Sequence, residues 1–309
     1  MVIWRNRPLM LGLAFSCLAA ASAQAQQSPT FEVGTRYWYS QGTDKFDLKD
    51  VAGTNMVSRL TWTGMTGNSG EIFARGTLGK GLFLKGYVGG GLLSNGSLQD
   101  EDFPPFVTPY SSTQSDAKGS LKYWSGDLGY NFVNSETTRL GAFVGYHHWS
   151  DTDEAYGCVQ TGGHPAICVP SIPNSVLGIT EDYTWDAVRL GLSTDYRSGA
   201  WSFQGEAAYA RAKLDMEDTH WLRLNTTNGF TGATPTDGNS SGVQLEAILH
   251  YQLTEHFSLG VGARYWKYLE ADGLTHFEQT AIPVGTFMSQ HSVVSSERRG
   301  VLLDATYKF

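Results

Sequence analysis

The segment WSFQGEAAYARAKLDMEDTH, residues 201–220, alternates between two kinds of side chain. Trp201, Phe203 and Tyr209 occupy odd positions, whereas positions 202, 204 and 206 carry Ser, Gln and Glu. In an extended chain, residues two apart project from the same face. The segment is therefore predicted to be a β-strand with an apolar outer face and a polar inner face.

The same alternation recurs along the chain and predicts ten strands. They cover residues 31–41, 54–79, 82–94, 118–133, 138–150, 183–196, 201–220, 242–253, 256–270 and 298–309. Tight turns at 79–81, 134–137, 197–200 and 254–255 alternate with the long links 42–53, 95–117, 151–182, 221–241 and 271–297. Short turns at one end and long loops at the other are typical of bacterial outer-membrane barrels, which have an even number of strands. We therefore expect an all-β, ten-stranded antiparallel transmembrane β-barrel that extends above the outer membrane, with long extracellular loops.

The N-terminal residues have the pattern of a secretory signal. Arg5 and Arg7 precede an apolar run over residues 9–21, and small residues lead to an expected cut before Gln26. Residues 1–25 are thus predicted to be a signal peptide and residues 26–309 one barrel domain. Loss of two arginines lowers the formal net charge from −8 to −10. The chain has 13% aromatic residues and 36 glycines, which suits a barrel; a periplasmic β-sandwich is the alternative.

Two short motifs carry the candidate chemistry. Asp100 and Asp102 flank Glu101, and Asp218 lies two residues before His220. Each motif presents two side chains on one face of an extended chain, so together they can hold and activate a water molecule. An imidazole titrates near neutral pH and is a suitable base, and a carboxylate can orient it. The two motifs are expected on opposite sides of the outer barrel rim.

Most of the 30 acidic residues fall in the long links or the adjoining strand ends. A negative outer rim would concentrate cationic peptides, although exposed acidic loops also simply favour solubility. Glu206, Glu246, Arg264 and Arg36 are expected to form ion pairs in the lumen.

Two cysteines remain after the signal, Cys158 and Cys168. In an oxidising compartment we expect them to form a disulfide that stiffens one outer loop, with two free thiols as the alternative. No histidine at suitable spacing accompanies them, so no metal site is expected. The adjacent His147 and His148 are expected to face opposite sides of a strand. The sequence gives no sign of nucleic-acid binding or of a redox cofactor.

The chain resembles the omptin family, which comprises ten-stranded outer-membrane endopeptidases. The resemblance is carried by Gly34-Thr35, Leu92 with Ser94-Asn95, Asp100-Glu101-Asp102-Phe103, Arg139-Leu140-Gly141, Gly145-Tyr146, Leu190-Gly191-Leu192, Asp218-Thr219-His220 and Tyr307-Lys308-Phe309. It implies an aspartic-type endopeptidase in which Asp100, Asp102, Asp218 and His220 are catalytic and face the cell exterior. It also implies peptide or protein substrates at the cell surface, cleavage beside basic residues, and a requirement for lipopolysaccharide but no other cofactor. We expect a monomer that contacts outer-membrane lipid.

The chain departs from the family pattern at the substrate pocket. Omptins bind the basic side chain with a first-strand Glu and an Asp two residues before the catalytic Asp, whereas here that second position is Met216. Met216 and Glu217 are retained as substrate-binding candidates, and Asp44 or Asp215 are possible substitutes. Of the family's lipopolysaccharide pattern on the fifth strand, Tyr146 is kept, while His148 and Ser150 replace the acid and the arginine.

Three functions follow as hypotheses. The first is an omptin-like endopeptidase. The second is a non-catalytic omptin-like barrel that acts as an adhesin or binding protein, which the Met216 substitution favours. The third is a small passive porin, which is disfavoured because side chains can largely fill a ten-stranded lumen.

Overall fold

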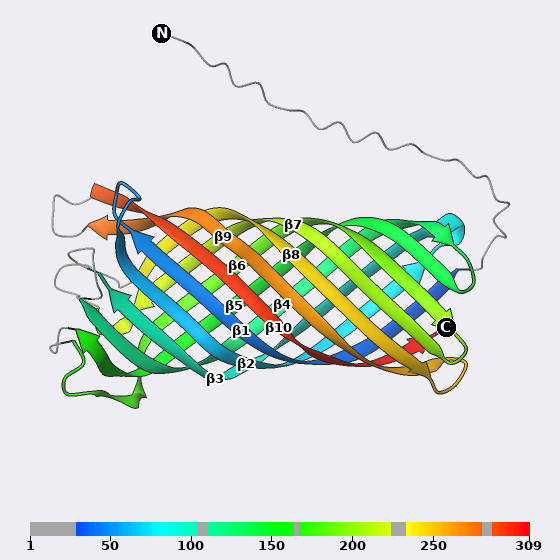
Figure 1. The fold of residues 1–309 in the computed structure, drawn as a ribbon, viewed down its shortest axis with the longest axis horizontal. Helices are drawn as coiled ribbons and strands as arrows, with labels where there is room; N and C mark the ends of the chain where they lie inside the picture. The colour runs from blue at the N-terminus through cyan, green and yellow to red at the C-terminus, as the bar shows by residue number, and fades with distance from the viewer. Residues whose placement is uncertain (1–28, 104–109, 164–166, 224–232, 280–285) are drawn as a thin grey trace, which may run out of the picture.

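Ten antiparallel strands pair edge to edge in a closed ring (Figure 1). The computed structural model describes residues 29–103, 110–163, 167–223, 233–279 and 286–309. Within these residues the strands are β1 (Thr30–Lys49), β2 (Met56–Thr77), β3 (Leu82–Asp102), β4 (Ser111–Asn134), β5 (Thr138–Gly163), β6 (Ile172–Ser198), β7 (Trp201–His220), β8 (Ala233–Gln252), β9 (Phe257–Gln279) and β10 (Thr286–Lys308). The predicted fold class is therefore confirmed. The predicted signal peptide lies outside the described residues.

Pairing of the first strand with the last closes the ring. The β1–β10 ladder runs from Glu32 opposite Lys308 to Leu48 opposite Ser292. Because these strands are antiparallel, the start of β1 and the end of β10 lie at the same end of the barrel (Figure 1). The four predicted tight turns also occur between strands, the first of them as a 3-10 turn at Gly79–Gly81.

Eight of the ten strands are longer than the sequence pattern indicated; β7 has the predicted bounds and β2 is slightly shorter than predicted. Much of the five links predicted as long outer loops continues the strands on either side; β5 ends at Gly163 instead of residue 150, and β6 begins at Ile172 instead of residue 183. The prediction failed there because the alternation continues with polar side chains on the inner face, which leaves no apolar periodicity to detect. In β5, for example, Asp151 and Asp153 are buried at alternate positions.

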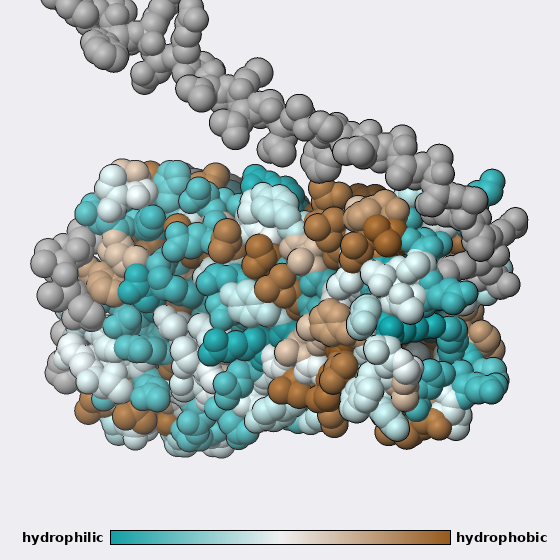
Figure 2. Space-filling model, turned by 45° about the vertical axis from the view of Figure 1, so that its right-hand side comes forward, coloured by the Kyte–Doolittle hydropathy of each residue, from teal (hydrophilic) through white to brown (hydrophobic). Residues whose placement is uncertain are grey.

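The outer surface carries an apolar band over one part of the barrel. Exposed large apolar side chains recur at alternate positions, such as Val188, Leu190 and Leu192 on β6 and Val301 and Leu303 on β10. Figure 2 shows hydrophobic side chains gathered over one part of the visible face and mainly hydrophilic ones over the rest. An outward apolar band flanked by aromatic residues is the surface that a barrel presents to lipid. Among the described residues, no helix is both long and apolar enough to span a membrane.

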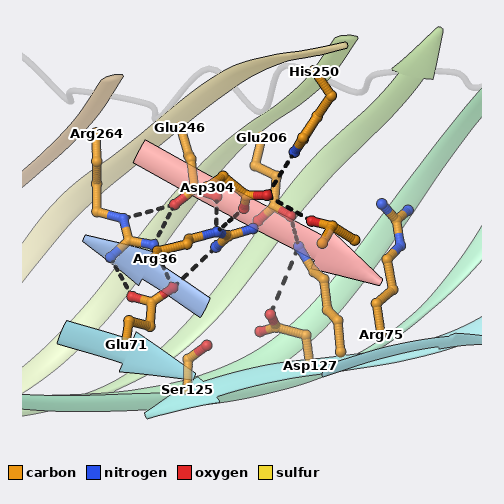
Figure 3. A network of polar contacts seen from close by, with 12 residues as sticks. Arg36, Glu71, Arg75, Ser125, Asp127, Glu206, Glu246, His250, Arg264 and Asp304 are labelled. Atoms are coloured by element: carbon orange, nitrogen blue, oxygen red, sulfur yellow. Dashed lines mark hydrogen bonds and ion pairs between the residues drawn. The ribbon is translucent and has the colours of Figure 1, made fainter. Parts of the chain in front are cut away.

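Ion pairs fill the lumen within the apolar band (Figure 3). Arg36 pairs with Asp304 at 2.8 Å and with Glu71 at 3.0 Å, and Arg264 pairs with Glu71 and Glu246 at 2.6 Å each. The expected lumen ion pairs are confirmed for Arg36, Arg264 and Glu246, and Glu206 pairs with Lys85.

An aromatic layer lies next to this network. Trp38 and Trp266 approach to 4.6 Å between ring centroids, and Trp185 and Tyr268 to 4.8 Å. His147 is buried among them and shares a hydrogen bond of 2.9 Å with the Tyr268 hydroxyl. Side chains therefore fill this part of the lumen and close off the barrel beneath its outer end.

Glu71 is the carboxylate that joins the two buried arginines, so its removal tests the network. In Glu71→Ala, Arg36 and Arg264 lose a partner in a buried setting, and we expect the free energy of unfolding to fall by about 3–5 kcal/mol. Urea unfolding of refolded protein, followed by tryptophan fluorescence, measures this loss. Glu136→Ala, in an exposed turn, serves as the control. Equal stability of the two variants would contradict a structural role for the network.

Candidate active site

Asp218 and His220 form a hydrogen-bonded pair at the outer end of β7. His220 Nε2 lies 3.0 Å from Asp218 Oδ2, and the Asp218 side chain is buried while His220 is partly exposed. With Nε2–H donating to the carboxylate, Nδ1 is the ring nitrogen that can accept a proton. The predicted strand 201–220 matches β7 at both ends, so the alternation that begins at Trp201 carries both residues to the inner face.

Neighbouring strands hold this end of β7 in place. The Thr234 hydroxyl on β8 donates to the main-chain oxygen of Asp218 at 3.2 Å. After His220, a 3-10 turn at Trp221–Arg223 bends back toward β6, where the Trp221 indole donates to the Thr180 hydroxyl at 2.8 Å. The imidazole therefore sits on an anchored strand end.

Asp100 and Asp102 lie at the outer end of β3. They continue the inward-facing register of buried Leu98 and are half-buried. Asp102 accepts a hydrogen bond of 2.9 Å from the Ser111 hydroxyl. In the ring, three strands separate β3 from β7, so the two motifs stand across the barrel mouth from each other as the sequence predicts. The structure joins Asp218 to His220 directly and places Asp102 against its neighbour on β4.

Met216 and Glu217 face opposite ways. Met216 is buried on the same face as Asp218 and packs in the apolar core. Glu217 is exposed on the outer face. Asp215 is also on the outer face, where it pairs with Lys213 at 2.9 Å.

Beside the Asp218–His220 pair lies a cluster of acids whose burial the sequence did not reveal. It consists of Asp44 on β1, Asp151 and Asp153 on β5 and Glu181 on β6, each no more than 1% exposed. Arg298 on β10 is also buried and pairs with Asp151 at 3.3 Å. These four residues fall within links that were predicted as long outer loops, but the strands continue through those links and turn the side chains into the lumen. The Asp-x-Asp spacing at 151 and 153, which repeats that at 100 and 102, was the available signal.

Burial dominates the titration of this cluster. It raises the pKa of Asp44 to about 7, with a further contribution from Asp151 that Arg298 partly offsets. Burial also raises the pKa of Asp153 well above its usual range, and the carboxylates of Asp44 and Asp151 add to the effect. Both Asp153 oxygens lack a hydrogen-bond partner among the described residues. This cluster of buried acids is thus a region where added positive charge is favoured.

A second Asp–His pair lies on the outer face. His276 Nε2 is 2.8 Å from Asp237 and His276 Nδ1 is 2.9 Å from the Ser289 hydroxyl. Unlike Asp218, the Asp237 side chain is 56% exposed, so solvent screens the pair. It provides a matched control for the lumenal dyad.

The remaining predicted features lie apart from the dyad. Cys158 and Cys168 are joined by a disulfide with Cα atoms 5.9 Å apart. His147 and His148 face opposite sides of β5, and His148 shares a 2.8 Å contact with Asp186. Tyr146 and His148 both stack against Trp124 on the outer surface. Within the described residues, no group of three or more His, Cys, Asp or Glu is arranged to hold a metal ion.

Comparison with protein-family models finds no match, and comparison with curated protein sequences finds no significant match. Comparison with solved structures finds a match over most of the chain. The chain is similar to the outer membrane protease OmpT from Escherichia coli, with a TM-score of 0.76, 14% sequence identity, and coverage of 93% of this chain and 99% of OmpT.

Two other solved structures overlap less well. The translocator domain of the autotransporter NalP from Neisseria meningitidis has a TM-score of 0.36 at 11% identity, with coverage of 89% of this chain and 88% of that one. The outer membrane protein AlkL has a TM-score of 0.34 at 14% identity, with coverage of 99% and 97%. The likeness to OmpT shows a shared fold, that of an OmpT-like outer-membrane β-barrel.

The buried acids make stability depend on pH. A carboxyl whose pKa is raised by folding stabilises the folded state fully below its unfolded pKa and loses that contribution as pH rises through the folded pKa. For Asp44 this window runs from 3.8 to about 7. We therefore expect the free energy of unfolding to fall across this range, with Asp44 contributing at most about 4 kcal/mol.

Asp44→Asn removes this titration. We expect the variant to lose less stability than the wild type between pH 4 and pH 8 in urea unfolding. Asp215→Asn, on the exposed outer face, is the control and should keep the wild-type slope. A wild-type pH dependence in Asp44→Asn would show that Asp44 is already ionised in the folded protein at low pH.

Proposed function

We propose that the protein is an omptin-like endopeptidase of the bacterial outer membrane, with its active site open to the cell exterior. The observation that carries the proposal is the Asp218–His220 hydrogen bond at the barrel mouth. The OmpT-like fold supports it by providing the same kind of scaffold. The sequence resemblance to omptins at both acidic motifs points the same way.

In the proposed mechanism, Nδ1 of His220 removes a proton from a water molecule as that water attacks the peptide carbonyl carbon. Asp218 holds the imidazole through Nε2 and stabilises the imidazolium that forms. The imidazolium then returns the proton to the leaving amine, which completes hydrolysis. Asp100 and Asp102, across the mouth, position the water from the other side.

The proposed substrates are peptides or proteins with basic side chains at the cell surface. Met216 is uncharged, so the negative charge that would bind a basic side chain of the substrate must come from other residues. Asp44, near the first-strand position of the omptin Glu, is the proposed replacement. Burial raises its pKa to about 7, and a basic side chain that enters the mouth would favour its ionised form. Lipopolysaccharide is a proposed requirement for activity, and we propose a monomer.

Loss of either dyad residue tests the function. We expect His220→Ala and Asp218→Asn to reduce cleavage of a mixed peptide library, with lipopolysaccharide present, by about 10²–10⁴-fold, because each removes the base or its orientation. Heat-modifiable gel mobility confirms that each barrel is folded. His276→Ala, which breaks the exposed Asp–His pair, should cleave like the wild type.

Wild-type cleavage by folded His220→Ala would contradict the mechanism. No cleavage by folded wild-type protein would instead favour a non-catalytic surface barrel that binds ligands. The residues flanking the cut sites report directly whether basic side chains are still selected.

The Asp pair on β3 has its own test. We expect Asp100→Asn and Asp102→Asn to lower kcat on the order of 100-fold, because a poorly placed water attacks less often. Glu101→Gln lies between them on the opposite face and is the matched control. If all three variants lost activity equally, the effect would be one of general charge and not of positioning.

A further inference from the structure

Glu181 lies directly opposite Asp218 in the pairing of β6 with β7. Both side chains are buried in the lumen. On one face of an antiparallel pair, directly opposed residues have Cβ atoms about 4.5–5.5 Å apart. Two carboxyl groups on such neighbours are close enough to share a hydrogen bond.

The hydrogen bonds around Glu181 distinguish its two oxygens. The Trp62 indole donates to Oε2 at 2.5 Å, and the Tyr183 hydroxyl donates to the same oxygen. Among the described residues, Oε1 has no partner. Asp218 shows the same asymmetry, since Oδ2 contacts His220 while Oδ1 has no partner in the described part of the chain. Two unpartnered carboxyl oxygens thus belong to directly opposed residues.

We propose that Glu181 is a positioning residue for the dyad, a neutral carboxylic acid whose Oε1–H donates to Asp218 Oδ1. In this arrangement Oε2 is the carbonyl oxygen that accepts from Trp62 and Tyr183. The donated hydrogen bond fixes the Asp218 carboxylate, so its second oxygen stays directed at His220. The effect of this hydrogen bond on catalysis rests on the proposed peptidase function. The hydrogen bond itself, a proton shared between Glu181 and Asp218, does not.

The surroundings of Glu181 favour its neutral form. Burial raises the pKa of Glu181 well above its usual range, and Asp218 is the charged neighbour that raises it most. The charged and titratable groups around it are Asp218 and His220 on β7, Asp151 and Asp153 on β5, Asp44 on β1, Arg298 on β10 and Tyr183 on β6. Asp153 on β5 also lies opposite Glu181, in the pairing of β5 with β6. Its carboxylate raises the pKa of Glu181 less than the carboxylate of Asp218 does.

A neutral Glu181 predicts that the activity falls when the pH is high enough to ionise it. Because the pKa of Glu181 is raised in the folded protein, its carboxyl group keeps its proton until the pH exceeds that pKa. The bond to Asp218 breaks and a second negative charge appears beside it. We therefore expect kcat/KM to fall on the alkaline side because the dyad loses its orientation.

The test compares Glu181→Gln and Glu181→Ala with the wild type. Glu181→Gln keeps a donor that does not titrate, so we expect near wild-type kcat/KM at neutral pH and loss of the alkaline decline. Glu181→Ala has no donor and should lose about 10- to 100-fold at every pH. Asp182→Asn, one residue along on the exposed face, should keep the wild-type profile, and Asp153→Asn should keep the alkaline decline.

A second measurement is independent of activity. NMR titration of His220 should give the same imidazole pKa in the wild type and in Glu181→Gln, because one neutral group replaces another. A lower His220 pKa in the variant would show that Glu181 is ionised and would overturn the proposal. If Glu181→Gln does not assemble, Glu181→Ala answers the same question.

Kinetic outcomes also decide the proposal. An alkaline decline that persists in Glu181→Gln, or is lost in Asp153→Asn, would overturn it. If the wild type cleaves no peptide, the peptidase function fails, and an unchanged His220 pKa would still support the shared proton.

Discussion

Closure of the barrel by the β1–β10 ladder is the constraint on which the rest of the structure depends. Once the sheet is closed, each side chain faces either the lumen or the exterior, and the chain alternates between them with a period of two. Pairing with both neighbours then satisfies the backbone of every strand, so the outer halves can hold charged residues on their inner face. The proposed catalytic dyad and the cluster of buried acids beside it both follow from this alternation.

The interior has two zones of different electrostatic character. Within the apolar band, arginines and carboxylates neutralise one another, as at Arg36 and Glu71. Above the aromatic layer, the four acids from Asp44 to Glu181 are accompanied by Arg298 as a buried cation. The lower zone is therefore built for stability. The upper zone concentrates buried acids whose pKa values are raised, an arrangement that proteins generally avoid unless it serves binding or chemistry.

The sequence predicted the class of fold, the number of strands and the tight turns, because apolar alternation and turn residues are local signals. It also placed Asp218 and His220 on the inner face, since the strand from Trp201 is unbroken. It failed at the outer strand halves, where both faces are polar and periodicity in hydropathy disappears. Glu181 was missed for this reason: only the β6–β7 register reveals that it opposes Asp218.

The strict alternation along β7 also limits how this protein can change in evolution. Loss or gain of one residue between Arg211 and Asp215 would move the following side chains to the other face. Asp215 and Glu217 would then enter the lumen, while Asp218 would leave it. Insertions and deletions in related chains should therefore gather in the links between strands, and substitutions should vary most at outward positions above the apolar band.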